Sequence, residues 1–291
     1  MTDKRVQFDF EIDFSNGGGL AGQAFRLDID GDDIADEALA DYIVSDLRLL
    51  MVGAVRIRNK TIIAEPHKRV VEARRFVDLS HTIEDGMITY KGFPAPLVCD
   101  HLSHVASRAN YAPGTEFQIG RIDMVGNTGT YIDSPYHRYA DGDDVADFAL
   151  DAIASLDAVV VRATGTRDRA ISRSAFAGLD VRGKAVLVHS GWDRHWRTDQ
   201  YFENHPFLTA DAATYLSDAG ATLVGIDSLN IDDTNEPTRP VHTTLLGAGI
   251  PIVEHLCGLD SVPTAGFRFS AVPPKVRGIG TFPVRAFALL D

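Results

Sequence analysis

One segment near the middle of the chain does most to decide the expected fold and chemistry, and it reads Asn127-Thr128-Gly129-Thr130-Tyr131-Ile132-Asp133-Ser134-Pro135-Tyr136-His137. A strand-like apolar pattern over residues 117–125 precedes the segment, and an acidic loop at residues 141–144 follows it. Gly129 permits backbone angles that other residues avoid, and Pro135 stiffens the exit from the segment. The segment can therefore hold polar side chains in fixed directions.

Asp133 and His137 are four residues apart, so a single turn of the chain can bring their side chains together. A carboxylate can ligate a metal ion. An imidazole can act as a general acid or base near neutral pH. A plain polar turn gives the same pattern, so these residues alone leave a structural and a chemical interpretation open.

Two further residues, His242 and Glu254, are candidates for the same chemistry. Glu254 ends an apolar run at residues 250–253, where a buried carboxylate is costly unless it is paired or bound to a metal. His242 on its own also fits a hydrogen-bonded histidine of the core or a loop. For the acidic residues after the apolar run at 222–226, the pattern favours capping of backbone N–H groups over metal binding; these are Asp227, Asp232 and Asp233.

Outward from this segment, short β-rich runs alternate with helical patterns; the runs lie at residues 158–162, 185–189, 222–226, 251–254, 267–271 and 285–289. The clearest helix spans Thr209–Ala219, where Thr209 can cap the start and Gly220 can stop the end. We therefore expect an α/β or mixed α+β domain over residues 76–291.

The first 75 residues have a different pattern and predict a small α/β extension. Strands are expected at residues 8–14, 24–29 and 54–63, and a helix from a cap at Asp32 or Asp33 to about Leu50. A connector is expected over residues 64–75, where Pro66 stands before a basic run. No catalytic pattern is found here, so a role in packing or oligomerisation is predicted.

Composition excludes several classes of partner. The 291 residues carry a net charge of −13, which disfavours nucleic acid and anionic lipid. No apolar run approaches the roughly 18–20 residues of a membrane helix, and no signal core follows Lys4 and Arg5. Two distant cysteines, Cys99 and Cys257, fit a reducing compartment. We expect a cytoplasmic protein that acts on a small molecule.

Residues 76–291 also resemble the cyclase family, which includes bacterial kynurenine formamidases and isatin hydrolases. The resemblance lies at residues 77–83, similar to an opening D-L-S-H, at 127–137, similar to H-x-G-T-H-x-D-x-P-x-H, and at 224–228, 240–242, 254 and 282–286. It implies a swivelling β/β/α fold with a β-barrel-like core and flanking helices. It also implies homodimers or larger assemblies, and hydrolysis of small amides such as N-formylkynurenine and the isatin lactam.

The resemblance further implies a metal site that is altered in this chain. The family's two leading signature histidines are replaced by Asn127 and Tyr131, while Asp133, His242 and Glu254 match the other ligand positions. Tyrosine ligates well only as phenolate, whose parent pKa is about 10. We therefore expect one divalent ion, Zn²⁺ or Mn²⁺, at the three matching residues, with the Asn127 oxygen as a weaker ligand.

The expected function is hydrolysis of a small amide, lactam or lactone, in which a metal ion activates water and polarises the carbonyl. His137 matches the family's proton-transfer histidine, and Tyr131 either donates a hydrogen bond or merely fills the vacated ligand position. Tyr90, Phe93 and Trp192 are predicted to contact the substrate. Two alternatives remain: a metal-poor lyase, dehydratase or ring-closing enzyme on the same scaffold, and a non-catalytic binding protein.

Overall fold

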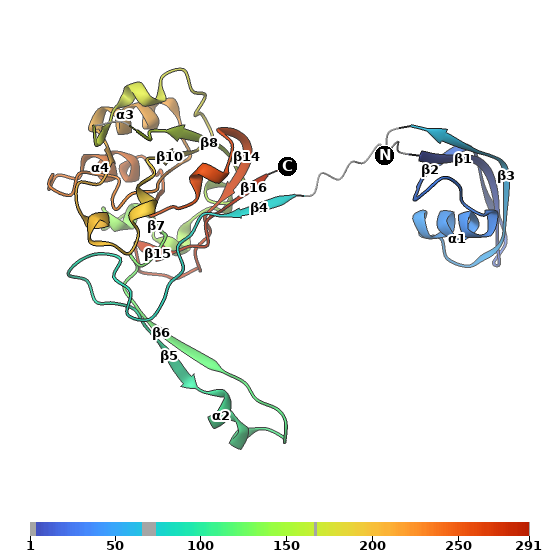
Figure 1. Ribbon diagram of the computed structural model, residues 1–291, viewed down its shortest axis with the longest axis horizontal. Coiled ribbons are helices and arrows are strands. Elements are labelled where there is room, and N and C mark those ends of the chain that lie inside the picture. The colour runs from blue at the N-terminus through green and yellow to red at the C-terminus, as the bar shows by residue number, and fades with distance from the viewer. Residues whose placement is uncertain (1–3, 66–73, 166–167, 291) are drawn as a thin grey trace. The chain divides into compact units, whose positions relative to one another are not determined.

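The computed structural model describes residues 4–65, 74–165 and 168–290, and the chain divides into two compact units, residues 1–72 and 73–291 (Figure 1). Most of the connector expected over residues 64–75 lies outside the described residues. Each unit has a sheet of its own, and the candidate site residues all belong to the second unit.

The N-terminal unit is a three-stranded antiparallel sheet with one helix, in strand order β2-β1-β3. Its elements are β1 (Lys4–Phe14), β2 (Gly19–Ile29), α1 (Asp36–Asp46) and β3 (Val52–Ala64). Alternation along β1 places Phe8, Phe10 and Ile12 on one face of the sheet. There they share a buried cluster with Leu39 and Ile43 of α1, so this unit has a core of its own.

The expected strands of this unit are confirmed, but the helix boundaries are wrong. The helix begins after Ala35 and ends at Asp46, well short of Leu50. Asp32 and Asp33 do not cap it, because the N-cap position is Ala35 and both residues lie before it. Their carboxylates lie beside Lys4 and Lys60 of the neighbouring strands.

The second unit is built on one nine-stranded mixed sheet that curls into a half-barrel with few helices, which confirms the expected mixed α+β fold class (Figure 1). In sheet order the strands are β15 (Thr281–Pro283), β7 (Tyr131–Asp133), β13 (Ile252–Glu254), β12 (Leu223–Ile226), β10 (Ala185–His189), β8 (Leu156–Arg162), β14 (Ala265–Ser270), β16 (Phe287–Leu290) and β4 (Arg75–Asp78). The four central strands β13, β12, β10 and β8 are parallel, and antiparallel strands flank them on both sides.

Hydrophobic side chains are buried on both faces of the central strands. Such strands read as continuous apolar runs because neither face meets water. On one face the strands share a core cluster with α3 (Ala210–Ala219) and α4 (Pro240–Gly247). Gly220 adopts a left-handed φ of 81° and ends α3 as expected.

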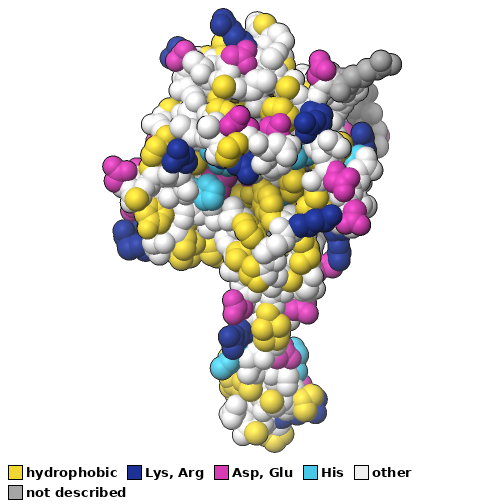
Figure 2. Space-filling model, turned by 90° about the vertical axis from the view of Figure 1, so that its left-hand side faces the viewer, with side chains coloured by type: hydrophobic (Ala, Val, Ile, Leu, Met, Phe, Trp, Pro, Cys, Tyr) yellow, Lys and Arg dark blue, Asp and Glu magenta, His cyan; other side chains and the backbone are white. Residues whose placement is uncertain are grey.

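A two-stranded arm extends from the body of this unit (Figures 1 and 2). It consists of β5 (Leu97–Leu102) paired with β6 (Ile119–Asp123), with α2 (His104–Ser107) between them. Large apolar side chains are exposed along the arm, namely Leu97, Val98, Val105, Tyr111, Phe117, Ile119 and Ile122. The homodimer or larger assembly expected from the sequence stays a prediction.

The remaining elements are short. They are the paired strands β9 (Ala170–Ile171) and β11 (Phe207–Leu208) and the 3-10 helices η1 (Arg108–Asn110), η2 (Pro135–His137), η3 (Val145–Asp147), η4 (Leu150–Ala152), η5 (Arg173–Phe176), η6 (Trp192–His195), η7 (Asp199–Phe202) and η8 (Leu259–Ser261). In the described part of the chain, no helix combines the length and apolarity needed to span a membrane.

Candidate active site

Strands β7 and β13 place three polar side chains on one face of the sheet. Tyr131 and Asp133 are two residues apart on β7, so their side chains point to the same face. The antiparallel register sets Glu254 of β13 directly opposite Tyr131. Helix α4 adds His242, and η2 adds His137 immediately after β7.

Asp133 is the most unusual group in this arrangement. Its side chain is 0% exposed, yet neither carboxylate oxygen has a hydrogen-bond partner among the described residues. An ionised carboxylate buried in this way is costly unless a positive charge lies beside it. The Nε2 atom of His242 lies 3.6 Å from Oδ2 of Asp133, and His137 completes a cluster whose ligand atoms lie within 4.8 Å of one another.

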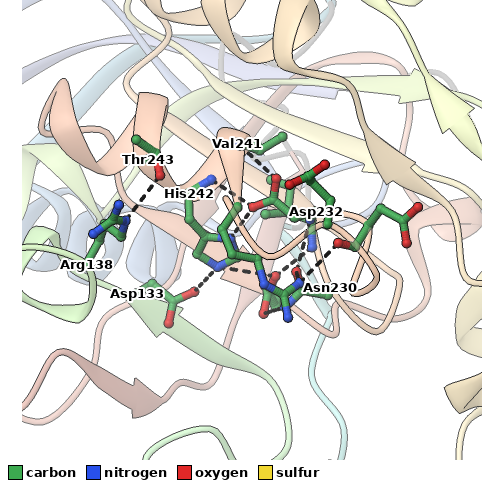
Figure 3. Close-up of polar contacts among 12 residues, drawn as sticks. Asp133, Arg138, Asn230, Asp232, Val241, His242 and Thr243 are labelled. Atoms are coloured by element: carbon green, nitrogen blue, oxygen red, sulfur yellow. Dashed lines mark hydrogen bonds and ion pairs between the residues drawn. The ribbon is translucent and has the colours of Figure 1, made fainter.

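His242 is held in place by Asp232 (Figure 3). The Asp232 carboxylate accepts from the backbone N–H groups of Val241 and His242, at 2.7 and 3.0 Å, and contacts Nδ1 of His242 at 2.6 Å. The first two bonds satisfy N–H groups in the first turn of α4. The third fixes the imidazole so that Nε2 faces Asp133, the arrangement that supports metal-binding histidines in general.

These charges suit a divalent cation. Burial lowers the pKa of His242, but the adjacent side chains of Asp133 and Asp232 outweigh burial and raise this pKa to about 10. The ion-free site therefore carries an imidazolium between two carboxylates. A divalent ion can take over this positive charge, and it would find two unpartnered oxygens on Asp133. The residues present fit such an ion.

Glu254 is buried just as deeply, but its oxygens are occupied. The Tyr131 hydroxyl donates a short hydrogen bond to Oε2, and the backbone N–H of Ile231 donates to Oε1 at 2.7 Å. The Asn230 amide lies 3.4 Å from Oε2. Burial raises the pKa of Glu254 to about 7. His242 Nε2 lies 3.7 Å from Oε1, so Glu254 borders the cluster.

Tyr90 extends this hydrogen-bond network. Its hydroxyl donates to the backbone oxygen of Leu229 at 2.5 Å and accepts from the Asn230 amide at 3.1 Å. It also lies 3.0 Å from the Tyr131 hydroxyl. Burial, followed by the nearby Glu254, raises the pKa of Tyr90 and of Tyr131 well above the usual value for tyrosine. Both residues are therefore neutral phenols, which are poor metal ligands.

The structure brings most of the expected site residues together. Asn127 lies beside Tyr131, and its side-chain oxygen accepts from Thr281 at 3.2 Å. The ring of Phe93 packs 5.6 Å from that of Tyr90. Trp192, in contrast, donates its indole N–H to the backbone oxygen of Tyr201, at 3.0 Å. The roles assigned to these residues stay predictions.

Sequence reasoning missed three supporting contacts. Asp232 was expected to cap backbone N–H groups, which it does, but its contact with the His242 imidazole joins residues ten apart around a loop. Asn230 lies two residues before Asp232, and nothing in the sequence indicated that its amide contacts Tyr90 and Glu254. Trp196, four residues after Trp192, stacks on His81 with ring centroids 3.9 Å apart. The Trp196 ring also lies 5.6 Å from that of His255, which lies 5.2 Å from the ring of Tyr131, and the sequence did not show that Trp196 has this position.

The family model described as "Putative cyclase" matches residues 77–233, which is more than half of the chain. The chain belongs to the cyclase family. Proteins named kynurenine formamidase from Bacillus cereus and Geobacillus thermodenitrificans are 25% and 28% identical over 217 and 214 residues. The alignments cover 74% and 72% of this cyclase-family chain and 98% and 95% of the relatives.

Solved structures of the cyclase family agree with the fold described above. One, named "The Structure Of Potential Metal-Dependent Hydrolase With Cyclase Activity", has a TM-score of 0.62 and 28% identity, and the match covers 75% of this chain and 99% of that chain. Isatin hydrolase A from Labrenzia aggregata has a TM-score of 0.65 and 21% identity, over 76% of this chain and 95% of its own. The second likeness supports the fold alone.

Proposed function

We propose that this cyclase-family chain is a metal-dependent hydrolase of a small amide, lactam or lactone. The observation that carries the proposal is the buried Asp133 carboxylate, whose oxygens are both without a hydrogen-bond partner among the described residues and which offers one of them to a cluster with the imidazoles of His137 and His242. A buried charge without hydrogen bonds has few other roles in a stable protein, and metal binding is the chief one.

A divalent ion bound here supplies Lewis acidity, which polarises a carbonyl group and makes water more acidic. Two imidazoles with a carboxylate, and one imidazole with two carboxylates, both suit Zn²⁺ and also Mn²⁺. The chain itself orients the donors: β7 fixes Asp133, and the carboxylate of Asp232 fixes the His242 ring.

Hydrolysis also needs a side chain that accepts a proton from water and returns one to the leaving group. Two groups that can do so lie beside the His242 imidazole: the exposed imidazole of His137 and the buried carboxylate of Glu254. Whichever of the two does not bind the ion is free to transfer the proton. The Tyr131 hydroxyl and the backbone N–H of Ile231 hold Glu254 in place by donating hydrogen bonds to its two oxygens.

A cavity of about 470 Å³ beside His137 indicates the kind of substrate. Its lining combines the apolar side chains of Met124, Val276, Ile279 and Phe282 with glycines and the hydroxyl groups of Tyr136 and Thr281. Apart from His137, none of the described lining residues carries an acidic or basic side chain. This lining suits a small uncharged ring, so we propose a neutral cyclic amide or lactone over a zwitterionic amino-acid derivative.

The test is to purify the chain without chelator, measure its metal content and assay a panel of substrates. The panel contains N-formylkynurenine, isatin, simple lactams and lactones. We expect turnover of a neutral cyclic substrate that chelation abolishes and Zn²⁺ or Mn²⁺ restores. Turnover of N-formylkynurenine near the enzyme median of about 10 s⁻¹ would contradict the substrate preference. No turnover of any panel member by ion-loaded protein would contradict the hydrolase proposal.

A further inference from the structure

We infer that Asp144 and Gly280 are positioning residues for the proposed reaction, because they hold the segment that walls the substrate cavity against the turn that carries His137. The substrate is proposed to bind in the cavity beside this histidine, so the role of both residues rests on the proposed function.

One side of the cavity beside His137 is a single segment of the chain. Six of the ten described lining residues lie within residues 276–282, which we call the cavity wall. The end of the cavity wall enters β15, where Thr281 pairs with Asp133 of β7 (Figure 1). Residues 276–280 belong to no helix or strand. Contacts other than sheet pairing must therefore fix this part of the cavity wall.

Asp144 supplies such a contact. Its side chain is 7% exposed, and its two oxygens accept hydrogen bonds from different segments of the chain. The backbone N–H of Ala146 donates to Oδ1 at 2.8 Å and so receives the cap at the start of η3. The backbone N–H of Gly278, in the cavity wall, donates to Oδ2 at 2.6 Å. One carboxylate therefore fastens the cavity wall to the loop that follows His137, and bonds to a charged acceptor are among the stronger hydrogen bonds.

Two backbone hydrogen bonds continue this attachment. The N–H of Val145 donates to the oxygen of Ile279 at 3.1 Å, and the N–H of Ser134 donates to the oxygen of Gly280 at 2.8 Å. Ser134 immediately precedes η2, the short helix that ends at His137. Three successive residues of the cavity wall, 278–280, are thus tied to both sides of this turn.

Gly280 lets the cavity wall approach His137 itself. A Cβ atom at residue 280 would lie 2.5 Å from the backbone nitrogen and 2.5 Å from the Cα atom of His137, far inside contact distance. Backbone atoms cannot turn aside as the end of a flexible side chain can, so only glycine permits this approach. The cavity wall therefore supports the backbone of His137 while it lines the cavity. Loosening the wall should weaken substrate binding, and displacing His137 should slow the reaction.

Serine at residue 144 separates the attachment of the wall from the cap of η3. Serine caps helices about as well as aspartate, but its single short hydroxyl cannot serve both segments. In Asp144→Ser, hydrogen exchange measured by mass spectrometry should be at least about tenfold faster for residues 276–282, since these amides lose a bond to a charged group. With a panel substrate that the wild type turns over, KM should rise about tenfold and kcat should change less than about threefold.

Gly280→Ala should show the opposite division between the two kinetic constants. The added Cβ must push the backbone of His137 away, and a displacement of about 1 Å at a reacting group can cost about a hundredfold in rate. We therefore expect kcat to fall at least about tenfold. If Gly280→Ala does not fold, the exchange rates and the KM of Asp144→Ser decide the question.

Two control variants match these substitutions. Gly120→Ala adds a Cβ on β6, where it would meet only the end of the Gln118 side chain. Asp9→Ala removes an aspartate of the N-terminal unit that also joins two segments, since it accepts from the backbone N–H of Ala24 and from the amide of Asn59, both at 2.7 Å. Both variants should keep the wild-type KM and kcat.

The positioning role and the proposed function fail in different ways. Exchange of residues 276–282 that is unchanged in Asp144→Ser overturns the attachment, whether or not any substrate is found. Faster exchange with an unchanged KM, or an unchanged kcat in folded Gly280→Ala, overturns the positioning role and leaves the hydrolase standing. Ion-loaded wild type that hydrolyses no panel member refutes the hydrolase, while the exchange rates still show whether Asp144 holds the cavity wall.

Discussion

Asp133 and Glu254 lie on paired strands and are almost equally buried, at 0% and 1% exposure, but their surroundings are opposite. Asp133 has two carboxylate oxygens without a hydrogen-bond partner in the described ranges. Glu254 has a donor on each oxygen. Burial of a carboxylate therefore does not by itself mark a metal ligand. The two carboxylates differ in the hydrogen-bond donors that surround them.

Removing Asp133 should have the largest effect on the chain. Asp133→Asn takes away the shared carboxylate, so we expect loss of the ion and a fall in kcat/KM of about a thousandfold, since an ion contributes several kcal/mol and each 1.4 kcal/mol is tenfold. Metal analysis and steady-state kinetics measure both. Asp227→Asn is a matched control, because Asp227 is a buried aspartate held by Ser190 and the Gly191 N–H. Wild-type activity in Asp133→Asn would refute the site.

Substitutions can make the surroundings of Glu254 resemble those of Asp133. Tyr131→His combined with Asn127→His restores the two histidines of the family signature and removes the hydroxyl that holds Glu254. The number of ions per chain should rise from one to two, as measured by elemental analysis. A double variant that still binds one ion would show that the signature has been aligned incorrectly.

Asp232→Asn should have an intermediate effect. Asparagine keeps the shape of the side chain but removes the charge that orients the His242 ring and satisfies the start of α4. Loss of such a supporting carboxylate typically lowers metal affinity about 10–100-fold. Competition with a chromophoric chelator measures the affinity. An affinity equal to the wild type would mean that His242 needs no support from Asp232.

The smallest expected effect is a dependence of stability on pH that only the ion-free protein shows. The pKa of His242 is raised from 6.5 to about 10, chiefly by Asp133 and Asp232 acting against burial. A raised histidine pKa stabilises the fold fully below about pH 6.5, and the contribution is lost as pH rises to about 10. The Tm of chelated protein should fall over this range. The Tm of ion-loaded protein should fall less, because its imidazole is already deprotonated. If the Tm of chelated and of ion-loaded protein fell equally with pH, His242 would not be protonated in the ion-free protein.

Features that depend on local sequence pattern could be predicted from the sequence. Contacts between residues far apart in the chain could not. Strand alternation and the Gly220 stop are local, and both are confirmed. The start of α1 was misplaced, because the helix begins after Ala35 and Asp32 and Asp33 lie outside it, beside lysines of other strands. The hydrogen bond between Tyr131 and Glu254 joins residues 123 positions apart, so it depends on the register of β7 with β13. Only the three-dimensional structure could show that both Glu254 oxygens accept hydrogen bonds.

The pairing of β4 with β16 determines when the second unit can be completed during synthesis. Asp78 pairs with Phe287, so the first strand of the unit waits for a partner that the ribosome adds about 200 residues later. At about 5–20 residues per second this wait is roughly 10–40 s. The N-terminal unit, whose core contains only its own residues, can fold within that interval. A nascent chain can therefore contain a complete N-terminal unit while strand β4 still has no partner.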